Sequence, residues 1–354
     1  MKETNYIGRC AYLDWIAGLL IVVVILLHIE LFTDYQLHFW HVWGERVFYF
    51  FMSWFFFKSG MFDKEQDYAT VCKKVWHTLV IPYLFFSIIS WLIWLPQFFH
   101  SQNSILLLFR ITFSRWVAVN LIPGNNPLWF LIALIGCRLL YPWFRKLLKN
   151  NYVVAFSAFL AAYVYHLIYM YATHKYLMLG IAQSCIGISY YAIGVELRHI
   201  QYLKSVFGVS LAVYIVTVVS FCPVINFAYA GTVSGELSWV CSLPVCIAGI
   251  ITWNNLIRFI PTRFLNLSGL CHIGNNSMTY YGIHWSIIIT IVFMYNVLGL
   301  QLFGLPSQYV MLLSCAVILP VADVLLRRYL PWAVGAKGRV HKGHEGGAAA
   351  DPLP

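Results

Sequence analysis

The chain has few charged residues. Asp, Glu, Lys and Arg make up 10% of its 354 residues, against roughly a quarter in an ordinary globular domain. Hydrophobic residues make up 61%, so the composition excludes a soluble globular domain and indicates a polytopic membrane protein. Acidic residues are scarcer than basic ones, at 13 against 23, and the net charge is +10. Because the basic residues flank apolar runs, membrane topology explains this excess better than nucleic-acid binding does.

The chain also lacks the cysteine patterns of a metal site or a disulfide framework. Its nine cysteines include no Cys-X-X-Cys pair, and most lie inside apolar segments. Their odd number and scattered spacing favour buried free thiols, and we expect no metal. No cleavable signal peptide is evident, because the apolar run after Cys10 is long enough to cross a bilayer. We expect the first helix to act as its own insertion signal.

Ten stretches are apolar enough, over about 20 residues, to cross a bilayer as helices. They are 11–32, 46–62, 77–98, 127–147, 152–172, 176–196, 204–222, 236–257, 275–298 and 308–329. With a cytoplasmic N-terminus, the cytoplasmic segments hold 17 Lys and Arg and the outside loops hold four, as the positive-inside rule requires. The predicted fold class is therefore all-α, with ten transmembrane helices and both termini in the cytoplasm, in the cell inner (plasma) membrane.

The predicted transmembrane domain covers residues 1–335. Residues 336–354 form a tail that is disordered or derived from an expression vector. The longest outside loop contains the apolar run 104–110, which we expect to form a short amphipathic helix on the outer membrane interface.

One histidine lies near the far end of the first predicted span. His28 is 17 residues after Ala11, so a helix that rises about 1.5 Å per residue places it roughly 26 Å up, towards the outer leaflet. Ionisable groups at that depth are costly and are candidates for function, and imidazole can relay a proton near neutral pH. The structural alternative is a histidine held between helices by hydrogen bonds. Glu30 follows closely, but residues two apart do not share a helix face.

Basic side chains gather at the inner end of the third predicted span, where Lys73, Lys74 and His77 lie. They can pair with lipid phosphates or hold a phosphorylated cytoplasmic ligand. Lys58 and Arg138 lie within predicted spans, where a bare charge is expensive. We expect Arg138 to face a polar cavity or to pair with an acidic residue such as Asp14, Glu30 or Asp323.

Two further polar segments open later spans. Asn126 and Trp129 begin the fourth span on its outer side, where asparagine can cap a helix and tryptophan suits the interface. Ser277, Tyr281 and His284 are spaced four and three residues apart, so they share one helix face. That face suits a buried hydrogen-bond network or a water-filled cavity.

Taken in order, five segments resemble acyltransferase family 3, whose members are integral membrane enzymes that O-acylate glycans. The segments are 13–28, 50–60, 73–83, 126–131 and 277–284. The overall character resembles the compact sugar O-acetyltransferases, such as fucose 4-O-acetylase-like proteins. The resemblance implies a cytoplasmic acyl-CoA donor, usually acetyl-CoA, and a sugar hydroxyl on a glycan or lipid-linked sugar as acceptor.

The resemblance also implies roles for individual residues, since His28 matches the family's catalytic histidine. We expect acyl transfer without a covalent enzyme intermediate, with His28 taking the proton from the attacking hydroxyl. In this scheme Glu30 and His284 complete the catalytic group. The remaining candidates bind the donor phosphates (Lys58, Lys73, Lys74, His77 and Arg138) or contact the acceptor or the developing oxyanion (Asn126, Trp129, Ser277 and Tyr281).

Three positions depart from the family pattern. Ala17 stands eleven residues before His28, where the family usually has Arg or Lys. Val75 and Thr78 stand in place of an arginine pair before the third-span proline. Another basic residue then has to supply the missing charge, and Arg9, Lys58, Lys73, Lys74 and Arg138 are the candidates. The alternatives are a transporter or flippase for glycans or lipid-linked sugars, and a catalytically silent family member.

Overall fold

The computed structural model describes residues 11–33, 44–101, 104–119, 121–173, 180–198, 204–220, 235–260, 264, 269–300 and 304–335. These residues form helices and short connections, with no strand beyond one isolated bridge between Ile122 and Asn125. The cysteines among them form no disulfide. The predicted tail and Arg9 lie outside the described residues.

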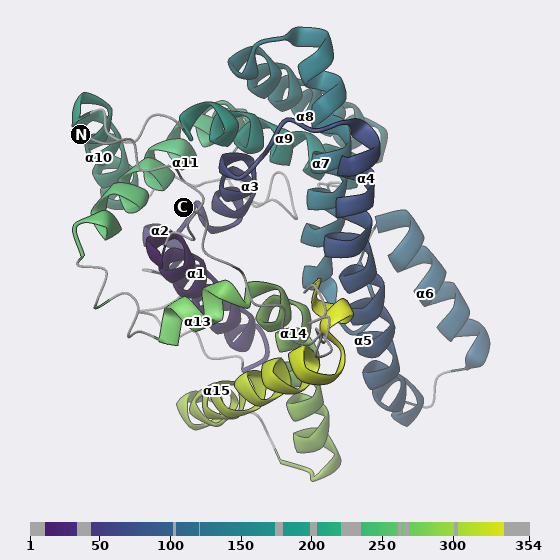
Figure 1. Cartoon of the computed structure of the whole chain (residues 1–354). Coiled ribbons are helices and arrows are strands. Elements are labelled where there is room, and N and C mark those ends of the chain that lie inside the picture. The colour runs from purple at the N-terminus through teal and green to yellow at the C-terminus, as the bar shows by residue number, and fades with distance from the viewer. Residues whose placement is uncertain are drawn as a thin grey trace, which may run out of the picture.

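The helices of the first half run from α1 to α7, and Figure 1 shows α4, α5, α6 and α7 grouped together to one side of α1. They are α1 (Ala11–Glu30), α2 (Glu45–Val47), α3 (Phe51–Met61), α4 (Tyr68–Val75), a π-helical turn (Trp76–Val80), α5 (Ile81–His100), α6 (Ile105–Val119), a 3-10 turn (Asn126–Leu128) and α7 (Trp129–Leu148). The second half adds α8 (Asn151–Thr173), α9 (Gly180–Leu197), α10 (Lys204–Ser220), α11 (Gly235–Arg258), α13 (Gly269–Asn275), α14 (Ser277–Val297), α15 (Gly304–Tyr329) and a 3-10 turn (Pro331–Val334).

Each of the ten predicted spans contains a helix. Within the described residues, six segments are long and apolar enough to cross a membrane: Ala11–Glu30, Tyr68–His100, Asn126–Leu148, Asn151–Ile168, Ser277–Val297 and Pro306–Tyr329. The chain is therefore a helical, multi-pass membrane protein. The total of ten spans and the cytoplasmic placement of both termini stay predictions.

The second predicted span differs most from its expected form. Residues 46–62 form two helices, α2 and α3, with a bend between them. The 11 residues of α3 rise only about 16 Å, which is too short to cross a bilayer alone. Trp54 and Phe56 on α3 are fully buried, because this aromatic helix packs against α9 in the protein interior.

The third predicted span begins earlier than its apolar run. The helix is continuous from Tyr68 to His100, and its first turn is capped by Asp67, whose carboxylate accepts bonds from the Thr70 backbone N–H (2.9 Å) and hydroxyl (2.6 Å). These bonds hold the pKa of the Asp67 carboxyl below its usual value. The π-helical turn precedes Pro82, which cannot donate a backbone hydrogen bond.

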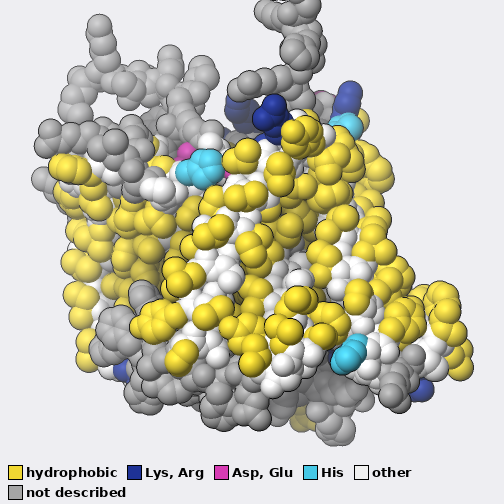
Figure 2. Space-filling view, turned by 90° about the horizontal axis from the view of Figure 1, so that it is seen from below, with side chains coloured by type: hydrophobic (Ala, Val, Ile, Leu, Met, Phe, Trp, Pro, Cys, Tyr) yellow, Lys and Arg dark blue, Asp and Glu magenta, His cyan; other side chains and the backbone are white. Residues whose placement is uncertain are grey.

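The outward surface is apolar. Figure 2 shows one face on which hydrophobic side chains cover the middle, while Lys and Arg gather mainly at the upper edge. The exposed side chains of α8 and α15 are large hydrophobic groups, including Phe156, Ile168, Leu313, Val317 and Val324. Helix α6 contains the predicted amphipathic run and exposes Leu106, Phe109 and Phe113. Its place on the outer interface stays a prediction.

Helix α1 packs closely against α13 and also contacts α3, α11, α14 and α15. A Cβ atom added at Gly274 would lie 1.7 Å from the backbone oxygen of Asp14, so glycine alone permits this approach. Gly18 on α1 lies against the backbone of Leu270 in the same way. The close contact fixes the position of α1, and with it the position of His28.

Candidate active site

Two histidines from distant parts of the chain meet inside the protein. Nδ1 of His28, on α1, lies 2.8 Å from Nε2 of His284, on α14. The rings stack with their centroids 5.0 Å apart and their planes 20° from parallel. His284 is fully buried, whereas His28 is partly exposed. The structure therefore brings together two of the three residues expected to form the catalytic group.

The hydrogen bonds fix the tautomer of each ring. Nδ1 of His284 lies 2.7 Å from the backbone carbonyl oxygen of Tyr281. A carbonyl oxygen can only accept, so His284 carries its proton on Nδ1 and presents a lone pair on Nε2. His28 must then donate from Nδ1 to that lone pair. The lone pair of His28 is consequently on Nε2, which is the arrangement a general base needs.

An aromatic residue that the sequence patterns did not single out borders the pair. The Trp285 ring lies edge-on to His28, with the ring centroids 4.9 Å apart. The Phe32 ring also packs against Trp285, with the ring centroids 5.1 Å apart. Trp285 is four residues after Tyr281 and shares its helix face. Extending the polar stripe of α14 by one residue would have found it.

The expected catalytic role of Glu30 stays a prediction. Glu30 is buried at the end of α1, where its backbone carbonyl accepts a bond from Thr33 N–H at 3.3 Å. The Nδ1 atom of His28 is already engaged by His284. The orientation of His28 is therefore set by His284 and the backbone of α14.

A buried amide holds α14 in place beside α5. Asn125 is fully buried and donates to the hydroxyl of Ser90 (2.9 Å) and to the backbone carbonyl of Gly282 (2.8 Å). Ser286 donates to the same Ser90 hydroxyl at 2.7 Å. The asparagine that ties this segment to the site is thus Asn125, one residue before the expected Asn126.

A cavity of about 500 Å³ reaches Tyr281, whose ring lies 5.8 Å from that of His284, and it is lined mainly by α3, α7 and α14. Three cations, Lys58, Lys74 and Arg138, line it, and we call their part of the cavity its basic end. Ser277 and Tyr281 line it from α14. The other lining residues are Ile21, Met52, Phe55, Ser59, Phe62, Thr78, Phe130, Leu131, Leu134 and Met278.

Tyr281 borders both this cavity and the ring of His284. Its ring lines the cavity and lies 5.8 Å from the His284 ring, and its hydroxyl donates to the Pro127 carbonyl oxygen. On α1, Ile21 lines the cavity seven residues before His28, a rise of about 10 Å. The pair therefore lies near the cavity, although neither histidine lines it.

The expected site residues divide into those that reach the cavity and those that do not. Lys58, Lys74 and Arg138 line it, whereas Lys73 and His77 are exposed and do not. Lys74 donates to Gln66 at 2.6 Å. Asn126 and Trp129 are also absent from the cavity wall; Trp129 is buried edge-on to Phe130, with ring centroids 6.1 Å apart.

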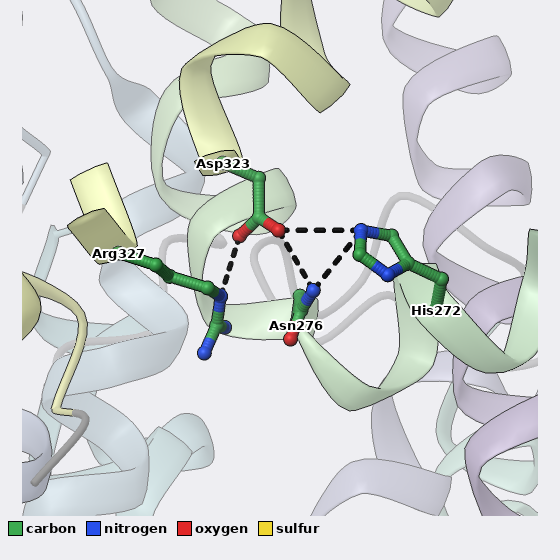
Figure 3. A network of polar contacts seen from close by, with 4 residues as sticks. All are labelled: His272, Asn276, Asp323 and Arg327. Carbon is green, nitrogen blue, oxygen red and sulfur yellow. Dashed lines mark hydrogen bonds and ion pairs between the residues drawn. The ribbon is translucent and has the colours of Figure 1, made fainter. Parts of the chain in front are cut away.

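Arg138 faces the cavity, as expected for one of its two possible roles. Two of the acidic residues proposed as alternative partners bind other cations. Asp14 lies 3.4 Å from Lys58. Asp323 is buried at 1% exposure and accepts from Arg327 Nε (2.8 Å) and from Asn276 (2.7 Å), with His272 at 3.3 Å (Figure 3). This network joins α13, α14 and α15 and positions the start of α14.

The acyltransferase domain family matches residues 11–327, which include every residue of the histidine pair and the cavity. The chain belongs to acyltransferase family 3. It is accordingly a membrane acyltransferase. The comparisons with curated proteins and with solved structures gave no match. Within the described residues of this acyltransferase, no group of three or more His, Cys, Asp and Glu side chains could hold a metal ion.

The three positions that depart from the family pattern have different surroundings. Thr78 lines the cavity, so a neutral hydroxyl replaces the expected charge there. Val75 is buried at 1% exposure, and Ala17 is fully buried in α1. The cavity of this acyltransferase therefore carries its positive charge on Lys58, Lys74 and Arg138.

Proposed function

We propose that this acyltransferase moves an acyl group, in the first place acetyl, from cytoplasmic acyl-CoA to a hydroxyl of a cell-surface glycan or lipid-linked sugar. The single observation that carries the proposal is the hydrogen-bonded series from the Tyr281 carbonyl through His284 to His28. It leaves Nε2 of His28 as a proton acceptor, and Tyr281, whose ring lies 5.8 Å from that of His284, lines a cavity that also holds three cations.

The transfer needs one proton relay and no covalent enzyme intermediate. His28 Nε2 takes the proton of the acceptor hydroxyl while its oxygen attacks the thioester carbonyl carbon. The tetrahedral intermediate then collapses, the carbon–sulfur bond breaks, and the CoA thiolate takes the proton from the imidazolium. His284 accepts a hydrogen bond from Nδ1 of His28 throughout, and this bond strengthens when His28 is charged.

The cavity suits the acyl end of a donor, with the thioester near Tyr281 and the rest of the donor extending towards the basic end. Ser277 precedes His284 by seven residues, about 10 Å along the helix. In this proposal Ser277 contacts the pantetheine arm, because it is too far along the helix to reach the reacting carbonyl. Tyr281 is one helical turn from His284, but its hydroxyl hydrogen is donated to the Pro127 carbonyl oxygen, so it reaches the developing oxyanion only if that bond breaks.

The test is acyl transfer by the purified full chain in lipid nanodiscs. Glycans extracted from cells lacking the gene serve as acceptors, with acetyl-CoA as donor and mass spectrometry of the glycans as readout. We expect release of one CoA thiol for each acetyl group gained. His28→Ala should lower the rate by about 10²–10⁴-fold. His100→Ala removes an exposed histidine at the end of α5 and should leave it unchanged.

Two results would overturn the proposal. One is a folded His28→Ala protein that binds acetyl-CoA and transfers acetyl at the wild-type rate. The other is passage of the sugar across a vesicle membrane without acetylation, which would instead identify a transporter or flippase. Release of no CoA thiol with any acceptor fraction would indicate a catalytically silent member.

A further inference from the structure

A second cavity, of about 410 Å³, lies at the other side of Arg138. We call it the vestibule. Its walls are the connection between α3 and α4, the last turns of α7, the start of α8 and the end of α9. The lining residues are Asp63, Lys64, Glu65, Gln66, Val71, Arg138, Tyr141, Pro142, Arg145, Lys146, Asn151, Tyr191, Val195, Glu196 and Arg198.

The two cavities follow each other along one face of α7. Phe130 and Leu134 line the first cavity, Tyr141 and Arg145 line the vestibule, and Arg138 lines both. Residues spaced three and four apart share a helix face. Arg145 lies 15 residues after Phe130, a rise of about 22 Å, so a ligand that occupied both cavities would be extended and would meet different chemistry at its two ends.

The vestibule is polar and has an excess of positive charge. Five cations line it, against three carboxylates. Two of these acidic residues already have partners: the Asp63 carboxylate accepts from the Tyr191 hydroxyl (2.7 Å) and Glu196 accepts from Asn151 (2.9 Å). The net charge therefore favours an anionic ligand.

Two arginine nitrogens in these walls are buried without a hydrogen-bond acceptor among the described residues. They are Nε of Arg138 and Nη1 of Arg145. A buried guanidinium N–H that makes no bond is costly, and its planar geometry matches the oxygens of a phosphate. Both atoms belong to residues that line the vestibule.

We propose that the vestibule binds the phosphorylated nucleotide end of CoA, with Arg138 and Arg145 contacting its phosphates. The pantetheine arm then runs past Arg138 into the first cavity and carries the thioester to Tyr281. This inference rests on the proposed function, because it assumes an acyl-CoA donor. It assigns binding of the donor phosphates to α7, and not to the exposed Lys73 and His77.

The experiment measures binding without transfer, using the full chain in phosphatidylcholine nanodiscs and isothermal titration calorimetry. The probes are acetyl-CoA, S-acetylpantetheine, which lacks the nucleotide, and adenosine 3′,5′-bisphosphate, which lacks the arm. Arg145→Gln should weaken the binding of acetyl-CoA and of the bisphosphate by roughly ten- to a hundredfold. It should leave S-acetylpantetheine binding unchanged, which also shows that the variant is folded. Lys149→Gln removes a charge from the end of α7 outside both cavities and serves as the control.

Several outcomes would overturn the assignment. One is that the wild type and Arg145→Gln bind acetyl-CoA equally well. Another is that Arg145→Gln weakens the binding of S-acetylpantetheine as much as it weakens the binding of acetyl-CoA. Inorganic phosphate should compete only weakly, so competition as strong as that of the bisphosphate would indicate a general anion site. If added phosphatidylglycerol displaces the bisphosphate, the vestibule holds a lipid headgroup instead. Should the vestibule bind acetyl-CoA as expected while no acyl transfer occurs, the proposed function fails and the binding site stands.

Discussion

Substitution of His284 should slow acyl transfer without abolishing it, because His284 acts through His28. In the resting state it accepts a hydrogen bond between neutral rings, whose net contribution is about 1 kcal/mol. In the transition state His28 becomes an imidazolium, and a bond from a charged donor contributes about 1.5–3 kcal/mol. The difference, about 0.5–2 kcal/mol, corresponds to roughly 2- to 30-fold in kcat for His284→Ala.

The assay is release of CoA thiol at saturating acetyl-CoA, with kcat and KM determined separately. The KM for acetyl-CoA should change little, since His284 does not line the donor cavity. His284→Gln offers an amide oxygen that can accept from His28 Nδ1, so it should recover part of the lost rate. The double variant with His28→Ala should be no slower than His28→Ala alone, because the two residues act as a unit. A further loss in the double variant, or equal rates for the alanine and glutamine variants, would refute the reasoning.

Three further predictions concern stability and local order. Asn125→Ala should lower the free energy of unfolding by about 1–3 kcal/mol, because it leaves buried partners unpaired, whereas Asn126→Ala should have little effect in the same thermal unfolding assay. Gly274→Ala should cost about 1–3 kcal/mol through overpacking, and Gly269→Ala, where nothing lies within 4 Å, should be tolerated. The pKa of Asp67 is lowered, so its cap stabilises α4 at neutral pH, and this stabilisation is lost as acidification protonates the carboxylate. Relative to a reference peptide at the same pH, the backbone amides of the first turn of α4 should therefore lose protection from hydrogen exchange at low pH and in Asp67→Ala.

The helical membrane fold could be predicted because hydrophobic runs and flanking charges are properties of local sequence. The form of the second predicted span could not be predicted in this way. An aromatic run such as 50–57 is equally apolar whether it faces lipid or packs inside the protein. Only the structure shows that Trp54 donates to the Asn254 side chain at 2.9 Å and that α3 is an interior helix.

The candidate site shows the same division between local pattern and tertiary packing. Helical spacing correctly placed Ser277, Tyr281 and His284 on one face, because that face follows from the period of the helix. It could not choose between Lys73 and Lys74, which are adjacent and point about 100° apart, so only one could face the cavity. The bond between His28 and His284 joins residues 256 positions apart, and no local pattern encodes that distance.

The position of Tyr281 bears on how the proposed reaction would avoid hydrolysis of its donor. Tyr281 lines the cavity, whereas His28 and His284 do not. In the proposed reaction, water beside a thioester in this cavity would therefore meet no histidine in the cavity wall, and the hydroxyl of Tyr281 already donates to Pro127. The proposed base would then act only on a hydroxyl that reaches His28 itself, so arrival of the acceptor would decide when the donor reacts.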